Sequence, residues 1–202
     1  MRVEYRTDSL IQDRSLVSFG EANGTTFGRI AGGFQWPVGD QPGFAAIVSE
    51  DIYEDETINT KHLRILQEFA EKDVDALLTW CEMRCMEMPT PMIELMWIGD
   101  NANEPAMRFA RARSKILRHQ GRKNILKVVP APYLESPKDQ RHDHYYQHFR
   151  RYLSKKALHF PEESVLMAEL HVLKDEPIYS VLALSYVVSY LANYPNRGRI
   201  MD

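Results

Sequence analysis

The sequence predicts an α/β domain with a mixed β-sheet and helices on both of its faces. Two apolar segments separated by a turn rich in Pro and Gly predict an antiparallel hairpin near the N-terminus. Segments with strand and helix character then alternate along the rest of the chain. The 202 residues are 44% hydrophobic and 26% charged, which is typical of one globular domain.

The predicted hairpin consists of a strand over residues 27–36, a turn over 37–42 and a buried strand over 43–49. Residues 1–26 are polar and mixed, and we expect them to form a lead-in before the domain. The acidic segment 50–59 leads either to a third strand or directly to a helix.

The longest helix is predicted over residues 60–88, with Thr60 as its N-cap. Its apolar positions recur at helical spacing and are Leu63, Leu66, Phe69, Ala70, Val74, Leu77, Leu78 and Cys81. Cys81 and Cys85 share one face of this helix. They have no Cys or His partners at zinc-finger spacing, so we predict two partly buried free thiols.

Shorter elements follow up to the C-terminus. The predicted strands are 93–98 and 125–129, with a short extended piece at 157–160, and the predicted helices are 105–119, 140–155, 165–173 and 175–194. Gly121 is the expected C-terminal cap of the second helix. The domain therefore spans residues 27–194, and 195–202 form a tail.

The charge and the apolar runs exclude some classes of protein. A net charge of −3 argues against a protein that coats nucleic acid over its whole surface, although it allows one basic patch. The sequence contains no secretory signal and no apolar run of membrane-spanning length. We expect a protein of the bacterial or host-cell cytoplasm.

Three groups of short patterns follow one another along residues 27–192. The first group is Ile30-Ala-Gly-Gly-Phe-Gln-Trp36, Asp40-Gln-Pro42 and Phe44-Ala-Ala-Ile-Val48, and the second is Trp97-Ile-Gly-Asp-Asn-Ala-Asn103. The third is Ala157-Leu-His-Phe-Pro161, Ala168-Glu-Leu170 and Asp175-Glu176 before Val181-Leu-Ala-Leu184. In this order the patterns resemble the nuclease domain of phage large terminases.

The resemblance implies a ribonuclease H-like mixed sheet whose carboxylates hold divalent metal and which cleaves viral DNA during packaging. Two departures from the family pattern are visible. Gly32, Gly33 and Phe34 fill the stretch of the first strand where the family carries an acid, and a second acid of the last helix would fall near Tyr179. The chain has no Walker A pattern, so the motor half of a large terminase is absent from it.

Metal-assisted cleavage of a phosphodiester requires clustered carboxylates. The resemblance assigns metal binding to Asp100, at a strand end, and to Asp175, with Glu176 assisting as a third catalytic residue. The expected cofactor is Mg²⁺ or Mn²⁺. A structural role is the alternative for each acid, since Asp100 also fits a turn and Asp175 and Glu176 also fit the first turn of a helix. Glu50 and Asp51 are weaker candidates to replace the missing first-strand acid.

A basic run without any acid follows Asp100. Its members are Arg108, Arg111, Arg113, Lys115, Arg118, Arg122 and Lys123. Such a run contacts double-stranded DNA through backbone phosphates, or it is a solvated helix face. A second basic segment holds His144 and His148 at helical spacing before Arg150 and Arg151, and we expect solvated or stacked histidines there rather than zinc ligands.

The primary hypothesis is a metal-dependent DNA endonuclease domain that acts with a packaging ATPase and a portal. The alternative is a DNA-binding or packaging module that kept the fold and lost its acids. A third reading, an unrelated α/β protein, predicts that Asp100 and Asp175 lie far apart.

Overall fold

The computed structural model describes residues 5–6, 20–22, 25–87, 96–99, 104–121, 127–130, 141–162, 164–170 and 179–193. The strands are β1 (Tyr5–Arg6), β2 (Gly20–Ala22), β3 (Thr25–Gln35), β4 (Gly43–Asp55), β5 (Thr60–Glu71), β6 (Met96–Gly99), β7 (Lys127–Pro130) and β8 (Leu158–His159). The helices are α1 (Val74–Glu87), α2 (Glu104–His119), α3 (Arg141–Ser154), α4 (Val165–Leu170) and α5 (Tyr179–Asn193).

One mixed sheet organises the chain. Its central strands run in the order β5-β4-β3-β6-β7. The strands β3, β4 and β5 are antiparallel, whereas β6 is parallel to both β3 and β7. The strand β8 adds to the outer edge of β5, and β1 and β2, from the segment predicted as a lead-in, extend the sheet beside the start of β3.

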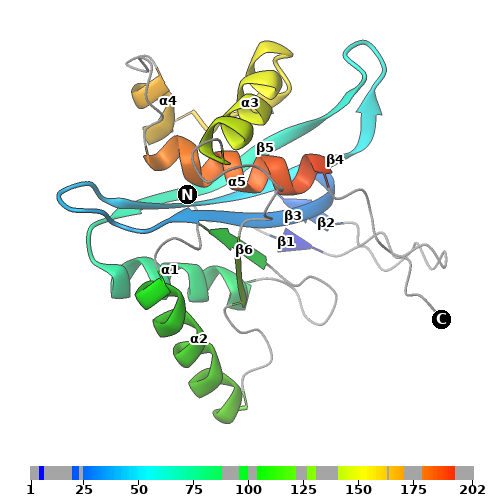
Figure 1. Cartoon of the computed structure of the whole chain (residues 1–202). Helices are drawn as coiled ribbons and strands as arrows, with labels where there is room; N and C mark the ends of the chain where they lie inside the picture. Colours follow the sequence, from blue (N-terminus) through cyan, green and yellow to red (C-terminus); the bar gives the residue numbers. More distant parts are fainter. Residues whose placement is uncertain are drawn as a thin grey trace.

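Helices cover both faces of the sheet, as the sequence predicted (Figure 1). The helix α5 packs on β3, β4 and β6, and α3 packs against α5. The helix α1 lies on the opposite face against β4 and β5, and α2 extends from that side of the molecule (Figure 1). No helix among the described residues is long and apolar enough to cross a membrane.

The strand β4 divides its side chains between two cores. Phe44, Ala46 and Val48 belong to the core beneath α5. Ala45 and Ile47 belong to the core beneath α1. Because both faces are covered, the strand reads as a continuous apolar run, which explains why it was identified as a buried strand from the sequence.

The predicted helix over residues 60–88 is wrong in its first half. Residues 60–71 form strand β5, and the helix α1 begins at Val74. The buried positions Leu63 and Ile65 alternate with partly buried ones, which is the period of a strand, up to a register shift at Leu66. Apolar residues also point to the α1 face, so the spacing of Leu66 and Phe69 imitated a helix.

Most other elements agree with the predicted ones within a few residues. Gly121 has a positive φ of 74° and donates its N–H to the carbonyl of Arg118, as expected of a C-terminal cap. Cys81 and Cys85 are buried thiols that form no disulfide within the described part of the chain, and burial raises the pKa of the Cys81 thiol. The start predicted for the last helix, at Asp175, lies outside the described residues.

Candidate functional site

Three elements meet at one edge of the sheet. The parallel strands β3 and β6 both end there, since Phe34 is paired with Gly99. The helix α5 runs antiparallel to β3, because its Ala183 lies over Gly33 and its Leu191 carbonyl accepts a hydrogen bond from Arg29. Its first turn therefore lies toward the C-terminal end of β3. We call this place the β3–β6 edge and define it by Gln35, Gly99 and the start of α5.

The lengths of the elements place the start of α5 near Gln35. Gln35 lies two residues beyond Gly33, or about 7 Å along a strand. Tyr179 lies four residues before Ala183, or about 6 Å along a helix. The two displacements have the same direction, so the first turn of α5 lies above the last residue of β3.

The predicted acids follow or precede these elements in the sequence. Asp100 comes directly after Gly99, and Asp175 and Glu176 come shortly before α5. All three acids lie outside the described residues. The structure describes the elements that flank these acids, β6 and α5, and both meet at the β3–β6 edge.

Close contacts exclude a side chain at Gly32 and Gly33, two of the β3 positions where the family pattern carries an acid. A Cβ atom on Gly33 would overlap the carbonyl oxygen of Ala183 in α5. A Cβ atom on Gly32 would overlap the indole ring of Trp97. Two close approaches, by a helix backbone and by a buried ring, therefore require glycine at these positions.

Gln35 is the polar side chain that β3 places at this edge. Alternation along the strand puts it on the α5 face together with Gly33. The residue is 5% exposed, and its Oε1 atom is buried with no hydrogen-bond partner among the described residues. No sequence pattern indicates this residue, because a lone Gln at the end of an apolar strand forms no motif.

The described residues place one oxygen donor at this edge, the side-chain amide of Gln35. An amide oxygen is a ligand of the kind that hard divalent cations accept, and a buried acceptor without a partner calls for an ion or a water. No group of three or more His, Cys, Asp or Glu side chains that could hold a metal occurs within the described part of the chain. Any such group at this edge would include the acids predicted there.

Glu50 and Asp51 do not substitute for the missing acid. The Glu50 carboxylate is buried and receives two hydrogen bonds from Arg29, both of 2.6 Å. Asp51 is paired with Arg64 at 2.9 Å. Glu50 is also paired with Arg29 in the sheet register, well before β3 reaches Gln35. Both acids are therefore bound to arginines away from the β3–β6 edge.

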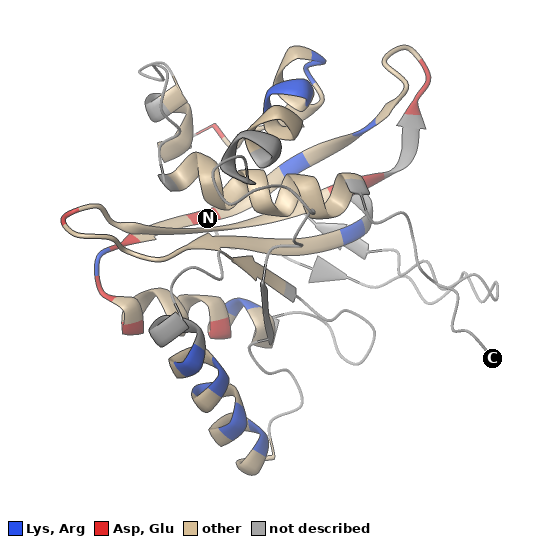
Figure 2. Cartoon of the chain, in the orientation of Figure 1, with Lys and Arg blue, Asp and Glu red and all other residues tan. Residues whose placement is uncertain are grey.

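Basic residues recur along the helix α2 (Figure 2). Arg108, Arg111, Lys115 and Arg118 are exposed, and their spacing aligns them on one side of the helix. Ala110 and Leu117 are buried on the opposite side. Arg122 and Lys123 of the predicted basic run lie outside the described residues.

Arg113 points toward α1 instead. Its guanidinium donates to Glu82 at 2.5 Å, to Asp75 at 2.7 Å and to Thr79 at 3.1 Å. The Glu82 side chain is only 7% exposed, and the hydrogen bond to it raises the pKa of Arg113. These contacts hold α2 against α1.

The second basic segment is partly engaged in contacts within the protein. Arg150 lies over the ring of Tyr146, 4.4 Å from its centroid, and Arg151 is exposed. The Lys155 amine donates to the carbonyl of Ile58 at 2.7 Å. The side chain of His144 lies outside the described residues.

A histidine pair that the sequence did not reveal joins β5 to β8. His62 Nδ1 lies 2.7 Å from His159 Nε2, and His62 Nε2 lies 2.9 Å from Asp55 Oδ2. The two histidines are far apart in sequence, so only the pairing of β5 with β8 brings them together. Burial, followed by the charge of Arg64, lowers the pKa of His159.

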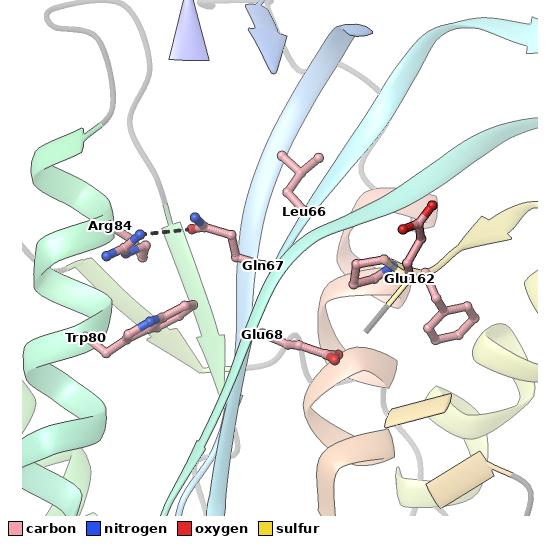
Figure 3. A pocket seen from close by; sticks show the side chains of 8 residues that line it. Leu66, Gln67, Glu68, Trp80, Arg84 and Glu162 are labelled. Carbon is pink, nitrogen blue, oxygen red and sulfur yellow. Dashed lines mark hydrogen bonds between the residues drawn. The ribbon is translucent and has the colours of Figure 1, made fainter. Parts of the chain in front are cut away.

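A pocket of about 820 Å³ lies at the outer edge of β5 (Figure 3). Its lining residues are Leu66, Gln67, Glu68, Trp80, Arg84, Phe160, Pro161 and Glu162. Arg84 lies over the ring of Trp80 and donates to the amide oxygen of Gln67 at 3.4 Å. Because β4 and β3 separate β5 from β6, this pocket does not belong to the β3–β6 edge.

The strand order, the parallel β6 and the helices on both faces define a ribonuclease H-like α/β fold. Among solved structures, the chain is similar to the nuclease domain of g2p, the large terminase of bacteriophage SPP1, determined with bound Mn. The TM-score is 0.51 at 13% identity, and the match covers 81% of this chain and 87% of that one. The chain therefore has the fold of a large-terminase nuclease domain, which confirms the fold predicted from the sequence.

A second similar structure is the large terminase nuclease of the thermophilic phage G20c, determined with bound zinc. Its TM-score is 0.48 at 11% identity, and the match covers 90% of this chain and 98% of that one. No protein-family model and no curated protein sequence matches the chain.

Proposed function

We propose that this chain is a metal-dependent DNA endonuclease domain of the large-terminase type that acts in viral DNA packaging. The observation that carries the proposal is the meeting of β3, β6 and α5 at one edge of the sheet. The end of β6 leads to Asp100, and α5 follows Asp175 and Glu176. The similar domain of g2p was determined with bound Mn.

Asp100 and Asp175 are the proposed ligands of Mg²⁺ or Mn²⁺, and Glu176 assists them. A divalent ion held by these residues would supply an activated water and would stabilise the leaving oxygen. Carboxylates brought close together would need such an ion, since close like charges are costly without a cation to neutralise them. The start of α5 favours negative charge through its helix dipole.

Double-stranded DNA is the proposed partner of the basic run. The exposed face of α2 offers Arg108, Arg111, Lys115 and Arg118, and the predicted run continues through Arg122 and Lys123. Contacts of this kind reach backbone phosphates and carry no base specificity. The nuclease-type domain spans residues 27–194, and a packaging ATPase and a portal in the host cell are its proposed assembly partners.

The second candidate function is a DNA-binding or packaging module without catalytic activity. The specific observation that favours it is the sequence of β3, which has no acid between Thr25 and Gln35. The steric demands at Gly32 and Gly33 show that an acid does not fit at either position without moving α5 or Trp97.

Nicking of supercoiled plasmid with Mn²⁺ or Mg²⁺ separates the two functions. We expect metal-dependent nicking by the wild type, loss of nicking in Asp100→Asn, and full nicking in Asp40→Asn. Asp40 is the matched control, because it is exposed in the turn after β3. If folded wild-type protein binds plasmid and leaves it intact with either metal, the endonuclease proposal is wrong and the binding module stands.

A further inference from the structure

We infer that the outer edge of β5 binds an extended peptide segment of a partner protein as an added strand, and that apolar and basic residues alternate in this segment. We call this surface the β5 edge and define it as residues 66–71 with the pocket beside them. The inference is independent of the proposed nuclease function, because β4 and β3 separate β5 from the β3–β6 edge.

The strand β5 is longer than the strand that pairs with its outer side. On the inner side, β4 pairs with β5 from Thr60 to Glu71. On the outer side, β8 is the paired strand within the described part of the chain, and it reaches only Leu63 and Arg64. Pro161 follows shortly after β8, and proline cannot continue a ladder of backbone hydrogen bonds. A strand edge that extends beyond its neighbour is a template for another extended chain.

The pocket of about 820 Å³ lies along this edge and includes side chains from both faces of the sheet. Gln67 is paired with Ile47, which belongs to the core beneath α1. Glu68 is paired with Ala46, which belongs to the core beneath α5. Figure 3 shows Arg84 on the α1 side of β5 and Glu68 on the other side. An added strand therefore directs alternate side chains toward two different surroundings.

The α1 side of the pocket favours an apolar side chain. Leu66 and Trp80 line it, and both are partly buried against the core beneath α1. The Arg84 guanidinium lies over the Trp80 ring and donates to the amide oxygen of Gln67. An apolar peptide residue on this side removes the remaining apolar surface of Leu66 and Trp80 from water.

The α5 side of the pocket carries negative charge. Glu162 is exposed. The Glu68 carboxylate accepts hydrogen bonds from the Ser164 hydroxyl at 3.1 Å and from the backbone N–H of Val165, so it is held at the start of α4. Two carboxylates on one side of an added strand favour lysine or arginine at the peptide positions that face them.

The same carboxylates argue against other occupants. DNA phosphates would be repelled by Glu68 and Glu162. A second copy of this chain, paired about a twofold axis, would bring the same surface of both copies together. Each acidic side would then face another acidic side, which is unfavourable across paired strands. A basic, extended segment of a different protein is the occupant whose charge complements this surface.

The test measures binding of a short, fluorescein-labelled peptide of alternating Val and Lys to the full chain by fluorescence anisotropy. We expect saturable binding, together with slower amide hydrogen exchange in residues 66–71 when the peptide is bound. A peptide with the same side chains but with every backbone nitrogen methylated cannot donate backbone hydrogen bonds, and we expect no binding from it. A peptide of alternating Val and Glu is also expected not to bind, because its charge has the wrong sign.

A charge reversal in the pocket tests the acidic side. Glu162→Lys is expected to bind the Val–Lys peptide about fivefold more weakly than the wild type. Glu56→Lys makes the same change at an exposed position in the turn between β4 and β5, at the other end of β5 from the pocket, and we expect wild-type affinity from it. Both positions are exposed, so both variants are expected to melt at the wild-type midpoint.

Several results would overturn the inference. One is the absence of Val–Lys peptide binding with protein at up to about 1 mM, which is the weak end of measurable affinities. Equal binding of the methylated peptide, or binding without protection of residues 66–71, would show that charge alone attracts the peptide. Equal affinities of Glu162→Lys and Glu56→Lys would place the peptide elsewhere. A dimer in sedimentation experiments that is protected at residues 66–71 and excludes the peptide would identify a second copy as the occupant.

Discussion

Replacing Gly33 with alanine tests whether the sheet and α5 approach each other as closely as the structure shows. The added Cβ would overlap the carbonyl oxygen of Ala183 and come within 2.9 Å of Val187 Cγ1. A helix carbonyl does not move aside as a flexible side chain does. We therefore expect the upper part of the overpacking range, a loss of about 3 kcal/mol of unfolding free energy.

This loss corresponds to a thermal midpoint about 6–12 °C lower for a domain of this size. Circular dichroism at 222 nm follows the transition, since helices contribute most of that signal. Gly39→Ala is the control, because Gly39 has a φ of 58° and no atom within 4 Å of an added Cβ. Its cost is about 1 kcal/mol of backbone strain. Equal midpoints for the two variants would refute the close approach of α5 as the reason for glycine at position 33.

Three further predictions concern α2 and the histidine pair. Arg113→Ala is expected to lower the unfolding free energy by about 1–3 kcal/mol in urea titrations, because the buried Glu82 carboxylate loses its partner. The unfolding free energy of Arg111→Ala should stay within about 0.5 kcal/mol of the wild-type value. The same variant should reduce the slope of log affinity for DNA against log salt concentration by about 1. An unchanged slope, measured by fluorescence anisotropy, would show that Arg111 is not part of the DNA interface. The lowered pKa of His159 means that the unfolded chain binds the proton first as the pH falls through the ordinary value of 6.5. The stability that the neutral His159 contributes is therefore complete above that pH and declines below it. His159→Gln should reduce the fall in thermal midpoint between about pH 7.5 and 5.5. An equally steep fall in the variant would contradict a lowered pKa for His159.

The hairpin of β3 and β4 was predictable because a local signal determines it. The turn between Pro37 and Pro42 contains Gly39 at a positive φ, and the apolar strand after it is buried on both faces. The parallel strand β6 and the helix α2 were also found close to their observed bounds. In each case the residues that decide the structure are neighbours in the sequence.

The strand β5 was missed because its environment is not local. It lies between α1 on one face and the α5 core on the other, so apolar residues occur on both sides of it. A register shift opposite Ile47 and Val48 leaves Leu66 without a partner in β4 and disturbs the alternation. A pattern of Leu63, Leu66 and Phe69 then fits a helix as well as a strand.

The candidate site shows the same division. The sequence indicated Asp100 and Asp175 through flanking patterns, and their roles stay predictions. Gln35 was missed because no local pattern predicts that a lone glutamine at the end of a strand is buried. The requirement for glycine at position 33 comes from the backbone of α5, which is far away in the sequence.

The most direct test of the metal site is a crystal structure of the wild-type chain grown with Mn²⁺, with anomalous diffraction used to locate the ion. We predict an anomalous peak at the β3–β6 edge, coordinated by the carboxylates of Asp100 and Asp175. A peak only at another place on the molecule, or Asp100 and Asp175 found on opposite sides of the sheet, would contradict the account.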